Sequence, residues 1–73
     1  STTIEYSLAE NVNDLNISVY DIRGRLVESI FNGSMYRGEH KIIWNGERYS
    51  SGAYFIKMNT GTHMFVKKIM LIK

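Results

Sequence analysis

The sequence contains no cysteine and no proline, and no apolar run approaches the roughly 20 residues that span a membrane. Without cysteine the chain has neither disulfides nor thiolate metal ligands, so its stability depends on noncovalent interactions. The lack of cysteine does not identify a compartment, because it suits a reducing cytoplasm and also exported bacterial proteins without disulfides. The excess of Lys and Arg over Asp and Glu is small, nine against seven, and indicates no dedicated nucleic-acid surface.

The chain also lacks the features of a secretory leader. It begins Ser1-Thr2-Thr3, with no initiator Met, no basic stretch and no short apolar segment. Residues 1–73 form one unit without a linker, an internal repeat or a low-complexity tract. We therefore expect a single small domain, the C-terminal module of a longer protein.

Six glycines, helped by asparagines, divide the chain into short runs that are rich in Ile, Val, Tyr, Phe and Thr. This spacing is typical of all-β proteins, since the runs alternate in hydrophobicity and end at turn residues. It predicts an all-β fold, a β-sandwich of six to seven short antiparallel strands. The expected strands cover residues 3–8, 15–20, 26–31, 40–44, 52–58 and 63–72.

The alternation also predicts which side chains point inward, because successive residues of a strand face opposite sides of the sheet. Turns are expected at residues 21–24, where Asp21 precedes Gly24, and at the Asn-Gly pairs 32–33 and 45–46. The predicted core is formed by six side chains: Ile17, Val19, Trp44, Tyr54, Ile56 and Ile69.

No catalytic or metal-binding frame is present. The sequence has no Gly-x-Ser-x-Gly elbow, no phosphate-binding loop and no His-Glu-x-x-His helix. Glu39 and His40 are adjacent, so in a strand they point to opposite faces. His40 and His63 lack the local spacing of a metal site. We expect no enzyme activity, no cofactor and no metal.

Exposed aromatic residues suggest a different function, a flat platform on which sugar rings stack. The candidates are Tyr36, Trp44, Tyr49 and Tyr54. Trp44 and Tyr54 lie in alternating strands, where burial in the core is the favoured interpretation. Tyr36 and Tyr49 lie in expected loops and stay candidates for ligand contact.

The C-terminal run 67–73 reads Lys-Lys-Ile-Met-Leu-Ile-Lys. As a strand it is apolar on both faces, with Ile69 and Leu71 on one side and Met70 and Ile72 on the other. Proteins normally protect such an edge, because its unpaired backbone groups can pair with another strand. We expect this strand to be used for β-augmentation by a partner, with an edge-strand dimer as the alternative.

Five blocks in this order resemble the C-terminal sorting domain of type IX secretion cargo, which is similar in turn to the Ig-like domain of the flagellar hook-capping protein. The resemblance covers nearly the whole chain. The blocks are Ile4-x-Tyr6-x-Leu8; Leu15-x-Ile17-x-Val19-Tyr20-Asp21-x-x-Gly24-Arg25-x-Val27; Gly38-x-His40-x-Ile42-x-Trp44-Asn45; Ser51-Gly52-x-Tyr54-Phe55; and Lys67-Lys68-Ile69-x-Leu71-Ile72-Lys73.

The resemblance implies an Ig-like sandwich at the end of a larger exported protein that passes through the periplasm to the outer-membrane surface or beyond. Its implied partners are the outer-membrane translocon, a sortase-type peptidase and the cargo domain upstream, with no nucleic acid and no membrane span. The alternative is an Ig-like structural or carbohydrate-binding accessory domain of a surface enzyme. The residues that match the sorting motifs are Tyr20, Asp21, Gly24 and Arg25, then Gly52 and Tyr54, and finally Lys67, Lys68, Ile69, Leu71 and Lys73.

Overall fold

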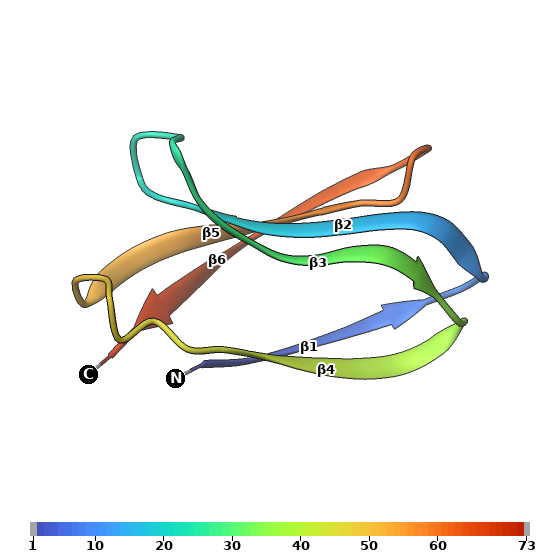
Figure 1. Cartoon of the computed structure of the whole chain (residues 1–73), viewed down its shortest axis with the longest axis horizontal. Coiled ribbons are helices and arrows are strands. Elements are labelled where there is room, and N and C mark those ends of the chain that lie inside the picture. Colours follow the sequence, from blue (N-terminus) through green and yellow to red (C-terminus); the bar gives the residue numbers. More distant parts are fainter. Residues whose placement is uncertain (1, 73) are drawn as a thin grey trace.

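The computed structural model describes residues 2–72 and is all-β, as the sequence predicts. Its six antiparallel strands form two sheets that lie face to face as a small sandwich (Figure 1). β1 and β4 form a two-stranded sheet, and the other four strands form a sheet in the order β3-β2-β5-β6. The strands are β1 (Thr2–Leu8), β2 (Val12–Tyr20), β3 (Leu26–Met35), β4 (Gly38–Trp44), β5 (Gly52–Asn59) and β6 (Met64–Leu71).

The chain changes sheets at β1–β2, at β3–β4 and again at β4–β5. The first two crossings lie side by side, since the backbone N–H of Arg37 donates a hydrogen bond to Asn11 Oδ1 at 2.8 Å. This contact ties the two sheets together at one end of the sandwich.

The predicted turn at residues 32–33 is wrong. β3 continues through both residues to Met35, with Asn32 opposite Asn16 and Gly33 opposite Leu15 in the ladder with β2. The register with β2 shifts three times, so β3 bends and runs longer than its Asn-Gly pair suggests. The chain turns instead at Tyr36 and Arg37.

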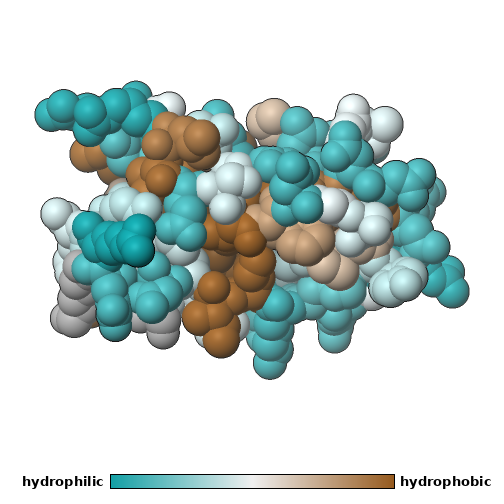
Figure 2. Space-filling view, in the orientation of Figure 1, coloured by the Kyte–Doolittle hydropathy of each residue, from teal (hydrophilic) through white to brown (hydrophobic). Residues whose placement is uncertain are grey.

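The core lies between the sheets and confirms the alternation in β2, where Leu15, Ile17 and Val19 are fully buried. Of the six predicted core residues, five are buried, whereas Ile69 is only partly buried against the cluster. The buried hydrophobic residues are Ile4, Leu8, Leu15, Ile17, Val19, Trp44, Tyr54, Ile56 and Leu71. Other apolar side chains pack against this cluster and are only partly buried. Figure 2 shows hydrophobic residues at the surface of one face of the molecule.

The loop from β4 to β5 is fitted closely against the last strand. A Cβ atom at Gly46 would lie 2.6 Å from Leu71 Cδ2 and 2.8 Å from its Cδ1, while Leu71 is 1% exposed. Glycine at position 46 therefore allows Leu71 to enter the core from the end of β6.

We expect Gly46→Ala to destabilise the domain by about 1–3 kcal/mol, because the added methyl overpacks the site around Leu71. Urea unfolding followed by tryptophan fluorescence measures this change. In the Leu71→Val background, which lacks both Cδ atoms, the same substitution should cost clearly less. Equal costs in the two backgrounds would contradict the proposed clash.

Candidate recognition surface

The predicted turn 21–24 connects β2 to β3 and is organised by Asp21. Its Oδ1 accepts hydrogen bonds from the backbone N–H groups of Arg23 and Arg25, both at 2.9 Å, and its Oδ2 accepts one from Arg25 Nε at 2.9 Å. The backbone N–H of Gly24 donates to the Asp21 carbonyl oxygen at 3.0 Å. Gly24 has φ of 83°, a conformation that glycine adopts without strain.

These contacts favour the charged form of the Asp21 carboxyl. The hydrogen bond from the Arg25 backbone is the largest cause, and with the Arg25 side chain it lowers the pKa of Asp21 below its ordinary value. Asp21 and Arg25 also form an ion pair at 2.9 Å, in which Arg25 is 70% exposed. The polar groups of this block mainly shape the turn, and the Arg25 side chain is the part that a partner can reach.

Tyr54 belongs to the core. It is 8% exposed, its ring meets the Trp44 ring edge-on at 5.2 Å, and its hydroxyl donates to the Ser50 carbonyl oxygen at 2.7 Å. Gly52 opens β5 opposite Leu71 of β6. This block therefore holds the loop before β5 and the end of β6 in place.

The residues of the closing block divide between the two faces of β6. In the ladder with β5, Lys67 lies opposite Ile56 and points toward the core side, whereas Lys68 lies opposite Phe55 and points outward. Both lysines are exposed, Leu71 is buried and Ile69 is intermediate. Lys73 lies outside the described residues.

Three strands bring motif residues into one row on the outer face of the four-stranded sheet. Tyr20 of β2 pairs with Phe55 of β5, which pairs in turn with Lys68 of β6. In the next row Lys57 lies opposite Val66, and its Nζ is 4.3 Å from the centre of the Tyr20 ring. We call this surface the outer patch; it consists of Tyr20, Phe55, Lys57, Val66, Lys68 and Met70.

Sequence reasoning named only Tyr20 and Lys68 of the outer patch. Phe55 stands in a motif block and Met70 on one face of the terminal strand, neither with an assigned role, and Lys57 and Val66 were missed. The available signal was the period of two along 53–57 and 66–70, which sets these side chains opposite the inward residues. These residues lie next to Tyr20 because β2 pairs with β5. The order of the strands in the sequence does not reveal this pairing.

The aromatic platform for sugars is not formed. Trp44 is 1% exposed and Tyr54 is buried beneath it, as the core interpretation expects. Tyr49 stacks on Trp44 with ring centroids 5.7 Å apart, and burial together with the nearby Glu28 raises the pKa of Tyr49. Tyr36 is 78% exposed but lies before β4, at the opposite end of that strand from Trp44. The alternative of a carbohydrate-binding domain is therefore not favoured.

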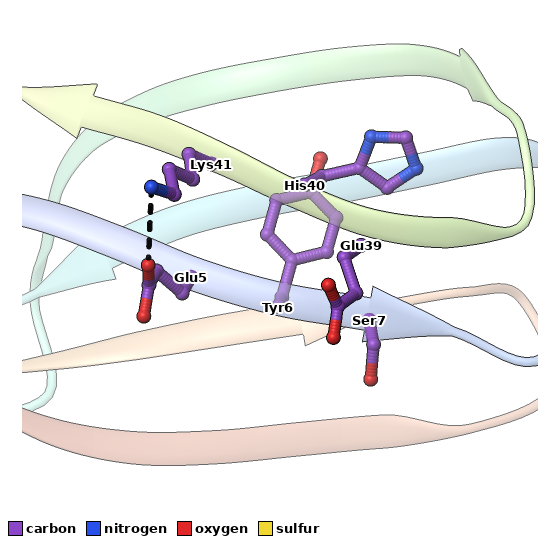
Figure 3. Close-up of a pocket in the computed structure, with 6 residues that line it drawn as sticks. All are labelled: Glu5, Tyr6, Ser7, Glu39, His40 and Lys41. Atoms are coloured by element: carbon purple, nitrogen blue, oxygen red, sulfur yellow. Dashed lines mark ion pairs between the residues drawn. The ribbon is translucent and has the colours of Figure 1, made fainter.

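The exposed hollow on the two-stranded sheet contains polar groups from β1 and β4 (Figure 3). Lys41 Nζ pairs with Glu5 at 3.5 Å, and the Tyr6 and His40 rings lie 5.3 Å apart. Burial raises the pKa of Tyr6. Among residues 2–72, no three His, Cys, Asp or Glu side chains are grouped to hold a metal ion.

Within residues 2–72 the structure has no helix long and apolar enough to cross a membrane. A family model described as a secretion system C-terminal sorting domain matches residues 1–73. No curated protein and no solved structure matches the chain.

The lowered pKa of Asp21 predicts a stability difference that depends on pH. The stabilisation from its carboxylate is complete above the ordinary pKa of 3.8 and is lost as the pH falls through the lower pKa of the folded state. Asp21→Asn should therefore lower the urea midpoint at pH 7, and the difference from the wild type should vanish in strong acid. Asp14→Asn, which removes an exposed carboxylate from β2, is the matched control. A midpoint difference for Asp21→Asn that stays constant down to pH 2 would refute this role.

Proposed function

Because the chain belongs to the family of secretion system C-terminal sorting domains, we propose that its outer patch is recognised by the type IX translocon. Membership makes the chain a C-terminal sorting signal for type IX secretion, in a family of targeting domains rather than catalysts. Such a signal contacts the secretion machinery and belongs to a cargo chain that is secreted to the outer membrane or cell surface.

The observation that carries the proposal is the row Tyr20, Phe55 and Lys68. These residues come from three separate motif blocks that lie far apart in the sequence, and the ladder aligns them on one face. Side chains on this face that are not needed to fill the core are free to serve recognition. The arrangement suits a partner that offers apolar surface beside carboxylates.

The charges of the patch support an acidic partner. Lys57 covers the Tyr20 ring, and Lys68 is exposed next to Phe55. No acidic residue follows Glu47 in the sequence. Val66 and Met70 are each 55% exposed and extend the apolar part of the patch. An interface of this kind combines apolar contact with charges that select the partner and orient it.

The remaining motif residues have structural roles in this proposal. Asp21 and Gly24 form the turn that follows Tyr20, Gly52 and Tyr54 fix the start of β5, and Leu71 anchors β6. Three further residues, Arg25, Ile69 and Lys73, stay predicted contacts from their motif positions.

The later steps of export belong to the same proposal. The cargo crosses the periplasm, the translocon engages the outer patch, and a sortase-type peptidase then removes the domain when the cargo is attached to the surface. The last step rests on the family resemblance.

Charge reversal in the outer patch should block secretion. In a bacterium with a type IX system, a reporter fused ahead of this chain is compared with the Lys57→Glu/Lys68→Glu variant. Because like charges at an interface cost several kcal/mol, we expect the secreted fraction to fall by about tenfold or more, with the reporter retained in the periplasm. Cell fractionation and immunoblotting measure both pools.

The control is Lys41→Glu, which reverses an exposed charge on the opposite sheet. It should be secreted normally, since its exposed pair with Glu5 contributes little to stability. Deleting 67–73 is a less clean test, because it also removes the buried Leu71 from the core. Normal secretion of the double variant, with its fold intact by circular dichroism, would overturn the proposed patch.

A further inference from the structure

The four-stranded sheet is wider than the sheet that covers it. Along the inner face of β6, Leu71 is 1% exposed and Ile69 is partly buried, but Phe65 is 53% exposed and Lys67 is also exposed. The two-stranded sheet thus covers only the last part of β6, although the inward side chains of β6 are mainly apolar along its whole length. β1 pairs only with β4 among the described strands, so its other edge keeps unpaired backbone groups.

A groove lies between this free edge of β1 and the inner face of β6. Its volume is about 120 Å³, and its lining includes Ile4 and Tyr6 from β1, Ile56 and Met58 from β5, and Phe65 and Lys67 from β6. Nearly all of the lining is apolar. Filling it with an aliphatic side chain would remove apolar surface of the core from solvent.

Lys67 is the cation in the wall of the groove, and it has no carboxylate partner among residues 2–72. The ion pairs that the described chain forms join Asp21 to Arg25 and Glu5 to Lys41. Glu5 also lines the groove, but its carboxylate already pairs with Lys41 of β4. The groove therefore combines an apolar floor, a free strand edge and an unpaired positive charge.

We propose that this groove binds an extended segment of a partner protein, which adds to the free edge of β1 and places a carboxylate against Lys67. The segment alternates apolar and polar residues, with one acidic residue among those that face inward. Its apolar side chains cover Phe65 and Met58, and its backbone pairs with β1. The inference rests on the proposed function only in taking this partner to belong to the secretion machinery.

A second copy of the chain fits the groove less well. The inner faces of β1 and β4 offer no acidic residue, since they present Ile4, Tyr6 and Leu8, and His40, Ile42 and Trp44. β3 carries one acidic residue on its inner side, Glu28, which lies opposite Val19. However, Glu28 Oε1 already accepts hydrogen bonds from Trp44 Nε1 at 3.4 Å and from the Tyr49 hydroxyl at 3.3 Å.

The test uses the 73-residue chain and a fluorescently labelled peptide, Thr-Val-Thr-Glu-Thr-Val-Thr, with both ends blocked. Fluorescence anisotropy should show saturable binding, and amide NMR shifts should change along β1 and β6. Lys67→Glu should weaken binding by about tenfold, as expected when attraction becomes repulsion. The peptide with Lys in place of Glu should restore the affinity of this variant.

Lys68→Glu is the matched control, because it reverses the neighbouring charge on the outer face and should leave binding unchanged. Four results would overturn the inference: no binding at millimolar peptide, equal losses in Lys67→Glu and Lys68→Glu, shifts along β3 instead of β1, or a dimer in sedimentation whose formation shifts the amides of β1. None of these results tests the proposed role of the outer patch, which is tested by the secretion assay.

Discussion

The sandwich depends on one side chain, Trp44, which fixes the two-stranded sheet onto the four-stranded one. It stands at the end of β4, is 1% exposed and is the largest fully buried side chain. Tyr54 of β5 meets its ring edge-on, Tyr49 stacks on its face, and Glu28 of β3 accepts its N–H. Contacts from two strands of the opposite sheet and from the loop 45–51 therefore converge on this residue.

A core of this size can cover only part of the larger sheet, and both candidate surfaces follow from that limit. On the inner side, the two strands β1 and β4 do not reach across to the first half of β6, so Phe65 and Lys67 stay open. On the outer side, no layer covers the sheet, so residues there are free to serve recognition. The last strand thus presents one lysine to each side, because adjacent residues of a strand face opposite sides of the sheet.

Alternation of apolar and polar residues was enough to predict most of the secondary structure and the core. The pattern in β2 determined that Leu15, Ile17 and Val19 point inward, and the structure buries all three. The same rule failed where two signals competed. The Asn-Gly pair 32–33 favours a turn locally, but the ladder with β2 continues through it, since unpaired strand groups would cost hydrogen bonds.

The sequence by itself determined an all-β sorting domain, because strand periodicity and the ordered motifs are properties of neighbouring residues. It also determined the Asp21 turn, whose hydrogen bonds join residues within four positions. Only the tertiary structure decided which motif residues meet and which are buried. Tyr20, Phe55 and Lys68 become neighbours because β2 pairs with β5 and β5 with β6, and Tyr54 is buried because Trp44 comes from the opposite sheet. Such pairings join distant segments through backbone hydrogen bonds and burial, which no local pattern encodes.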